Sequence, residues 1–290
     1  MDLSSPPLHL VLGLLIAPAL IASVVMLLSV RKSALRDLGR FGALALGLGY
    51  VAGHRASLTE WPAFPPAASG EALLYAGALA GLGGLIAGSV AHRRVALLIV
   101  GLFHLGACWL VLRNVLLAMP VHEMLAFSGV ALVLPSSVAV LFDRFAERER
   151  GPVAPLVLWM CASAGAGAIA LTGSVIFAQF SASLAAVLGA ALALCVLVRD
   201  VSFARGLTLA ALPHAALLAI AAANLSELPQ PAVLLLTIAP LAVFAVPAAT
   251  LRRVSTPWRV LIPSLLVALP LVAALVVCWL EHAQSANAYS

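Results

Sequence analysis

Long apolar runs, separated by short segments that carry the charges, make up most of this chain. A helix that crosses a hydrocarbon core of about 30 Å needs about 20 mostly apolar residues. The pattern therefore predicts ten membrane-spanning helices, at residues 8–30, 38–54, 70–91, 95–112, 123–142, 153–172, 175–198, 205–223, 232–250 and 258–280. The predicted fold class is an all-α, polytopic integral membrane helical bundle.

Two of these spans need further argument. The apolar region 153–198 would be about 69 Å long as a single helix at 1.5 Å per residue, which is far more than one crossing, so we place a turn at Thr172-Gly173-Ser174. The second span, 38–54, is short and rich in glycine, and such a segment can also lie at the interface or re-enter the membrane. The distribution of basic residues decides between these alternatives.

Lys and Arg residues gather on the cytoplasmic side of membrane proteins. With ten spans, only Arg55 and Arg113 of the 16 Lys and Arg residues fall on one side. The other 14 share the opposite side: Arg31, Lys32, Arg36, Arg40, Arg93, Arg94, Arg144, Arg148, Arg150, Arg199, Arg205, Arg252, Arg253 and Arg259. Without the second span the split would be only 10 against 6, so ten spans with both termini outside the cytoplasm are favoured.

Composition agrees with a lipid environment. Of the 290 residues, 63% are hydrophobic and 9% are charged, and the mean hydropathy is +1.13. About one quarter of a soluble domain is charged, so this chain has too little polar surface to face water. The lipid bilayer is the expected partner. The net charge of +5 is explained by orientation in the membrane rather than by nucleic acid. The Ala-rich, Arg-rich usage suggests a bacterial inner (plasma) membrane.

The chain is expected to form a single transmembrane domain over 1–290. Its halves, 1–142 and 153–290, would be joined by a charged inner loop at 143–152, which we interpret as a solvated cap or, alternatively, a docking site. Because each half holds five spans, the halves would have opposite orientations, as in many secondary transporters. In size and helix number the chain resembles the ten-helix drug/metabolite transporter superfamily. That superfamily keeps both termini in the cytoplasm, so the resemblance is limited to those two properties.

Two histidines lie inside predicted spans, whereas every carboxylate lies at or near a membrane surface. His104 and His214 each follow an inner-side arginine by nine or ten residues, which places both near mid-depth. Such imidazoles can ligate haem iron or a metal, relay a proton, or hydrogen-bond a neighbouring helix; packing is favoured. Cys108, four residues after His104, would share its helical face and add a soft-metal ligand. All four cysteines otherwise suit apolar packing.

Other residues suggest further sites. A metal site at the outer surface would use nitrogen and oxygen ligands from His9, His54, His122, Glu123 and His282. Prolines at 135, 213, 240, 247, 263 and 270 mark helices that can break and free carbonyl groups. A substrate cavity near mid-depth would be lined by His104, Ser136, Ser137, Gln179 and His214.

Glycines at GxxxG spacing predict close helix packing. The three pairs are Gly49/Gly53, Gly77/Gly81 and Gly84/Gly88. Small residues let backbones approach, because helix association in lipid depends on van der Waals packing. We expect this packing within the chain first and in a homo-oligomer second.

The function predicted from these features is a transporter or permease for a small solute. The alternatives are a haem- or metal-handling membrane protein that uses His104 and His214, and a non-catalytic membrane sensor, scaffold or assembly component. No kinase, hydrolase or deaminase motif is visible, so an enzyme is not favoured and no resident cofactor is predicted.

Overall fold

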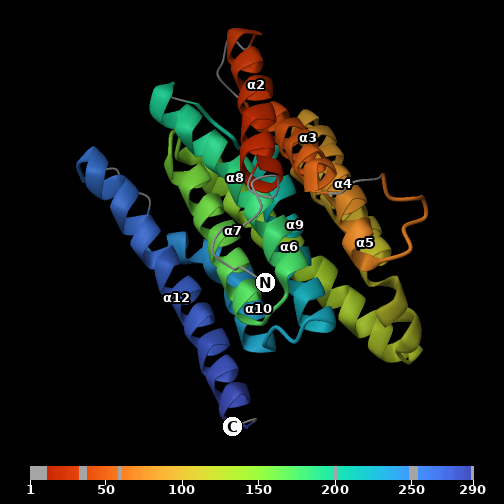
Figure 1. Ribbon diagram of the computed structural model, residues 1–290. Coiled ribbons are helices and arrows are strands. Elements are labelled where there is room, and N and C mark those ends of the chain that lie inside the picture. Colours follow the sequence, from red (N-terminus) through yellow and green to blue (C-terminus); the bar gives the residue numbers. More distant parts are fainter. Residues whose placement is uncertain (1–11, 33–37, 58–60, 199–200, 248–253, 289–290) are drawn as a thin grey trace.

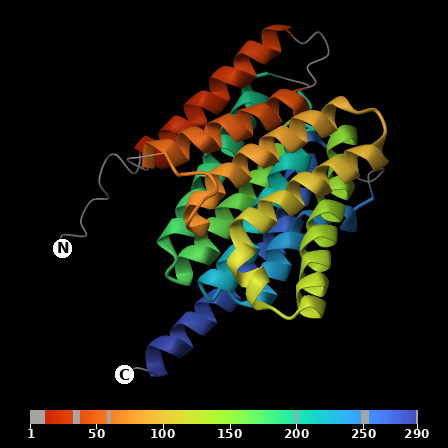
Figure 2. The ribbon, with the colours of Figure 1, turned by 90° about the vertical axis from the view of Figure 1, so that its right-hand side faces the viewer.

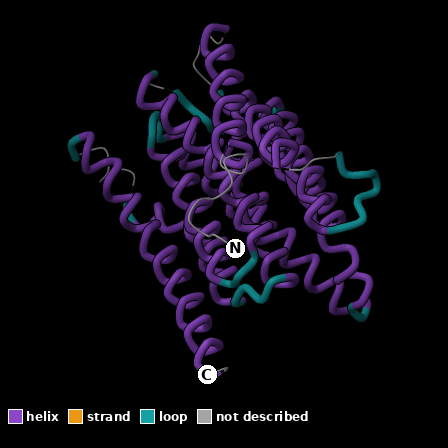
Figure 3. Tube along the Cα trace, in the orientation of Figure 1, coloured by secondary structure: helices purple, strands orange, loops and turns teal. Residues whose placement is uncertain are grey.

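The computed structural model describes residues 12–32, 38–57, 61–198, 201–247 and 254–288, and every regular element within them is a helix (Figures 1 and 3). The elements are η1 (Leu12–Ile16), α2 (Ala17–Lys32), α3 (Gly39–Ser57), α4 (Ser69–Ser89), α5 (Arg93–Ala118), α6 (Val121–Arg148), α7 (Val153–Leu171), α8 (Val175–Leu197), α9 (Leu207–Leu225), α10 (Gln230–Ile238), η2 (Ala239–Ala245) and α12 (Thr256–Ala288). Eight of these helices are long and apolar enough to cross a membrane. The predicted all-α, polytopic membrane bundle is confirmed.

Each of the ten predicted spans has a helical counterpart, and the predicted turn at residues 172–174 separates α7 from α8. The two spans outside the apolar set of eight are α3, whose sequence is less apolar, and α10 with η2, which is shorter. At 1.5 Å per residue α3 is about 28 Å long. The nine α-helical and seven 3₁₀ residues of α10 and η2 together reach about 27 Å, because a 3₁₀-helix rises about 2.0 Å per residue. Both lengths suit a crossing; the count of ten stays a prediction.

Helix α9 lies at the centre of the bundle. Of the residues in its span, 83% are buried. It contacts α3, α4, α5 and α6 from the first half of the chain, and α7, α8 and α10 from the second. The two halves are therefore interleaved around this helix. At the other extreme, α12 is only 22% buried and packs on α7, α10 and η2 at the edge of the bundle, where Figures 1 and 2 show it extending past the other helices.

Glycines allow α9 and the residues just before it to approach their neighbours so closely. A Cβ atom on Gly88 of α4 would lie 1.8 Å from the carbonyl oxygen of Arg205, and one on Gly39 of α3 would lie 1.6 Å from that of Ala204. Between α3 and α4, a Cβ on Gly81 would lie 2.6 Å from the Cα of Gly47. The other glycines of the three GxxxG pairs also face helices of the same chain. Their expected role in packing within the chain is confirmed.

The charged segment that the sequence predicts as a solvated inner loop is different in the structure. Residues 143–148 form the last turns of α6, and Asp143 and Glu149 are buried. The Oδ1 atom of Asp143 accepts a hydrogen bond from the backbone N–H of Arg205 at 2.6 Å and another from the hydroxyl of Thr208. Buried carboxylates need such partners, so this segment turns inward and holds the start of α9.

Two glutamates extend this contact into a network that we call the charged end of the bundle. Glu147 accepts hydrogen bonds from Arg93 of α5 and from Nε of Arg205, the latter at 2.7 Å. Glu149 accepts one from Nε of Arg259 in α12 at 2.8 Å. The network ties α5, α6, α9 and α12 together. Its three arginines are among those that the sequence places on one side of the membrane.

Of the six prolines singled out in the sequence, Pro240 lies at a change of helical geometry, and Pro247 lies just beyond the end of η2. The α-helical geometry of α10 changes to 3₁₀ geometry at Ala239-Pro240. Pro135 in α6, Pro213 in α9, and Pro263 and Pro270 in α12 lie inside continuous helices.

We predict that Gly88→Ala destabilises the bundle by about 1–3 kcal/mol, because the added methyl group meets backbone that cannot move aside. The matched control is Gly129→Ala in α6, where the added methyl group meets no atom within 4 Å. That change should be neutral or stabilise the helix by up to about 1 kcal/mol. Thermal unfolding in detergent measures both variants. Equal midpoints for the two would contradict this packing.

Candidate functional site

His104 of α5 is held by α6. Its Nε2 lies 2.9 Å from the carbonyl oxygen of Ala131, and since a carbonyl only accepts, Nε2 carries the hydrogen. This carbonyl lacks its usual helical partner because the residue four positions later, Pro135, has no N–H. The imidazole therefore replaces the missing helical hydrogen bond. This geometry supports the packing interpretation of His104.

His214 of α9 is in a different situation. Its side chain is 1% exposed, and neither ring nitrogen has a hydrogen-bond partner. The ring stands at 88° to that of Tyr50 in α3, with 4.6 Å between the centroids. A buried polar atom without a hydrogen-bond partner costs about 1–3 kcal/mol of folding free energy, so the unpaired nitrogens of His214 destabilise the folded protein.

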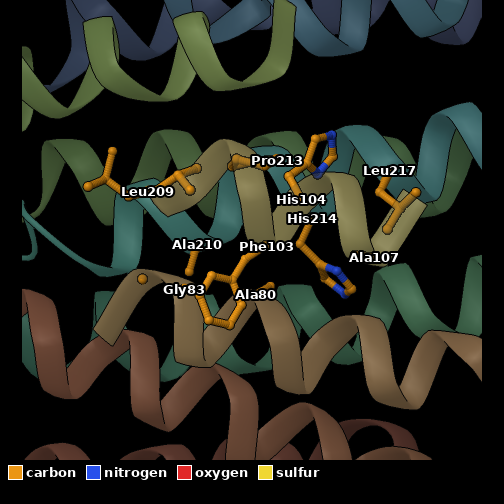
Figure 4. Close-up of a pocket in the computed structure, with 12 residues that line it drawn as sticks. Ala80, Gly83, Phe103, His104, Ala107, Leu209, Ala210, Pro213, His214 and Leu217 are labelled. Atoms are coloured by element: carbon orange, nitrogen blue, oxygen red, sulfur yellow. The ribbon is translucent and has the colours of Figure 1, made fainter. Parts of the chain in front are cut away.

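The two histidines line one small cavity between α4, α5 and α9. Its volume is about 20 Å³, room for about one water molecule. The other walls are Ala80, Gly83, Gly84, Val100, Phe103, Ala107, Leu209, Ala210, Pro213 and Leu217. In Figure 4 the two imidazole rings point in opposite directions. That agrees with the hydrogen bond of His104 to α6 and the ring contact of His214 with α3.

This arrangement bears on the haem hypothesis. The structure brings His104 and His214 together at one cavity, as their predicted equal depth implies. Axial ligands of one haem must face each other across a porphyrin. Here the rings point apart, Nε2 of His104 is engaged with a carbonyl, and the cavity has room for one water. The residues present do not fit a haem in this arrangement. Cys108, the residue predicted to add a soft-metal ligand, also lies beside His104, with 3.6 Å between its Sγ and Nε2 of the imidazole.

A row of buried rings leads away from His214. We call it the aromatic row; it consists of His214, Tyr50, Phe180 and His54. Phe180 of α8 lies 6.0 Å from Tyr50 and stacks on His54 at 4.5 Å, between ring centroids. Nε2 of His54 donates to the carbonyl oxygen of Gly70, at the start of α4, while its Nδ1 and the hydroxyl of Tyr50 have no partner.

Sequence reasoning missed Tyr50. The available signal was its spacing from His54: residues four positions apart share one face of a helix. A tyrosine in a membrane helix was otherwise easily assigned to the interface, where tyrosine is common.

The remaining residues of the predicted mid-depth cavity lie elsewhere. Ser136 is buried and its hydroxyl has no partner, and Ser137 and Gln179 are half-buried. None of these three lines the cavity of His104 and His214.

The residues predicted for an outer metal site are also dispersed. His54 is buried in the aromatic row, whereas His122 and Glu123 are exposed at the start of α6, 3.9 Å apart. His282 is exposed on α12, and His9 lies outside the described residues. Among the residues with described positions, no group of three or more His, Cys, Asp or Glu side chains is placed to hold a metal ion.

A second cavity, between α6, α9 and α10, was not expected from the sequence. Its volume is about 180 Å³, and it is lined by Pro135 and by the polar residues Asn224, Gln230 and Thr237, with Phe127, Val130, Ala131, Leu134, Ile220, Val233 and Leu234. We call it the α10 cavity.

A larger hollow of about 610 Å³ between α5 and α6 is nearly all apolar and includes exposed side chains such as Leu102, so lipid chains suit it.

The fold thus defines a multi-pass membrane protein with two polar features, the buried aromatic row and the α10 cavity, part of whose lining (Val130, Gln230 and Leu234) is exposed at the surface of the bundle. Comparison with protein-family models, curated proteins and solved structures finds no match for this chain.

We predict that His104→Leu and His214→Leu have opposite consequences for stability. The first change leaves the Ala131 carbonyl buried without a donor and should cost about 1–3 kcal/mol. The second removes two polar atoms that have no partner, so it should be neutral or stabilising. Thermal unfolding of the purified variants is the measurement. A large loss of stability for His214→Leu would show that its nitrogens are bonded within the protein.

Proposed function

We propose that this protein is a transporter that moves a small solute across the inner membrane of a bacterium. The α10 cavity carries this proposal, because it combines solute-sized volume with three polar side chains in a hollow between three helices that opens to the surface of the bundle. Ligand sites of this kind are concave and mostly apolar, with a few polar groups that fix orientation.

The position of the cavity supports transport rather than a static site. One wall is α10, whose geometry changes from α to 3₁₀ at Ala239-Pro240, two residues after Thr237. Many secondary transporters bind their substrate beside such interrupted helices near the middle of the membrane. A second wall is α6 around Pro135, where the carbonyl of Ala131 is bonded by His104 instead of by a helical N–H. Two adjacent walls therefore depart from regular α-helical hydrogen bonding, and the change of geometry in α10 is the one that favours movement.

The polar groups of the α10 cavity suit a small, neutral or zwitterionic solute. Its lining contains one hydroxyl and two amide side chains but no charged residue. Thr237 donates its hydroxyl hydrogen to the carbonyl oxygen of Val233 at 2.8 Å, which leaves the hydroxyl oxygen able to accept from a solute.

We predict that Thr237→Val reduces uptake by about three- to tenfold, because valine keeps the volume of threonine but removes one hydrogen bond to the solute. The matched control is Thr172→Val, at the end of α7, which should take up solute as the unaltered protein does. Proteoliposomes are supplied with radiolabelled pools of amino acids, monosaccharides, organic acids and quaternary amines. Uptake of every pool at the level of empty liposomes would rule out the proposed function.

The proposed orientation places the charged end in the cytoplasm and both termini outside. It is supported by the 14 basic residues on one side of the ten-span arrangement.

We predict that alkaline phosphatase fused after Ser290 is active, since the enzyme needs the periplasm, and that a fusion after Gly151 is inactive. The reverse pattern of activity would overturn the orientation.

A further inference from the structure

The aromatic row has no role in solute binding at the α10 cavity, and its chemistry suggests a different one. We propose that His214, Tyr50 and His54 form a proton path from the centre of the bundle to the end opposite the charged end. This inference rests on the proposed function and deepens it, since it names the proton as the coupling ion of the transporter.

The first support is the unusual concentration of polar atoms without partners. The hydroxyl of Tyr50, Nδ1 of His54, and both ring nitrogens of His214 are buried and unbonded. The three side chains are at most 1% exposed. Almost all buried polar groups in proteins are hydrogen-bonded, to protein or to water. Three adjacent exceptions indicate that water or a mobile proton completes their bonding.

The second support is the spacing of the three groups through the membrane. Helices α3 and α9 begin at the same end of the bundle, where Gly39 lies against Gly206. Counted from those starts at 1.5 Å per residue, His214, Tyr50 and His54 lie at about 10, 16 and 22 Å. Each step along the bundle axis is therefore about 6 Å. The path ends at Gly70, at the start of α4.

The third support is the nature of the groups. An imidazole has one nitrogen that can accept a hydrogen bond and one that can donate, and a phenol both donates and accepts. Two other titratable groups adjoin the row: His104, across the cavity from His214, and Glu71, beside Gly70 in the first turn of α4. The carboxylate of Glu71 accepts a hydrogen bond from the N–H of Ala67, and the proposal takes this end of α4 as the exit of the path.

The transfer balances without any other reactant. A neutral imidazole binds a proton on its unprotonated nitrogen and then, as imidazolium, releases a proton from its other nitrogen. At His54 the released proton passes to water on the side of Glu71, because the Gly70 carbonyl accepts a hydrogen bond but does not take up a proton. Rotation of each ring restores its original tautomer before the next proton. The oxygen of Tyr50 accepts a proton while its own hydrogen passes to the next acceptor. One proton moves, each group returns to its neutral form, and nothing is oxidised or reduced. The cavity beside His214 has room for about one water, which would pass a proton to the imidazole.

The test uses Tyr50→Phe in proteoliposomes that contain a trapped fluorescent pH indicator, with a membrane potential set by valinomycin and a potassium gradient. Proton entry is recorded with and without each solute pool. We expect the unaltered protein to admit protons and Tyr50→Phe to reduce the rate by about tenfold or more. Because the lost hydroxyl has no partner within the protein, thermal stability should stay the same, which separates a proton-transfer role from a structural one.

The matched control is Tyr75→Phe in α4, whose hydroxyl donates to the carbonyl oxygen of Pro62 outside the aromatic row. It should leave proton entry unchanged. Equal rates for Tyr50→Phe and the unaltered protein would overturn the path. Solute uptake without proton entry would overturn proton coupling alone and leave the transporter proposal intact. Proton entry that depends on Tyr50 without uptake of any pool would overturn the solute proposal alone.

Discussion

The carboxylate of Asp143 holds the first turn of α9, and the rest of the structure depends on this contact. It accepts hydrogen bonds from the backbone of Arg205 and the hydroxyl of Thr208. A negative charge at the N-terminus of a helix also interacts favourably with the helix dipole. Arg205 has a φ of 57°, a left-handed conformation that is uncommon for a residue with a side chain, so the approach to α9 needs such an anchor. The anchored helix is the one around which both halves of the chain pack.

Close packing around α9 then determines where polar groups are isolated. Glycines in α3 and α4 bring these helices against α9 with no space for a Cβ atom, and Tyr50 fills the position beside Gly77. In so tight an interior His214 and Tyr50 contact each other ring to ring, and neither nitrogen nor hydroxyl reaches a protein partner. Natural sequences keep such unfavourable features mainly where function requires them. The interior polar groups, rather than any loop, are therefore the chemically distinctive part of the molecule.

Sequence reasoning predicted the architecture well because lipid imposes simple rules. Apolar run length located ten helices, glycine spacing located close contacts, and arginine positions located helix ends that meet in the structure. Sequence reasoning failed where the hydrogen-bond partners of a side chain come from residues far away in the sequence. Asp143 looked like part of a solvated loop, since its partners lie more than 60 residues away. That His104 and His214 lie at the same level of the bundle was predictable, but the directions of their rings depend on Ala131 and Tyr50, which no local pattern identifies.

The central claim is that water reaches the buried aromatic row, and radiolytic footprinting with water labelled by a heavy oxygen isotope tests it most directly. Side chains in contact with ordered internal water incorporate the label, whereas dry core side chains do not. Phe142 is a suitable reference because it is as fully buried as Tyr50 but lies among apolar neighbours near the charged end. The account predicts clear incorporation at Tyr50 and almost none at Phe142. Equally low incorporation at both positions would contradict it.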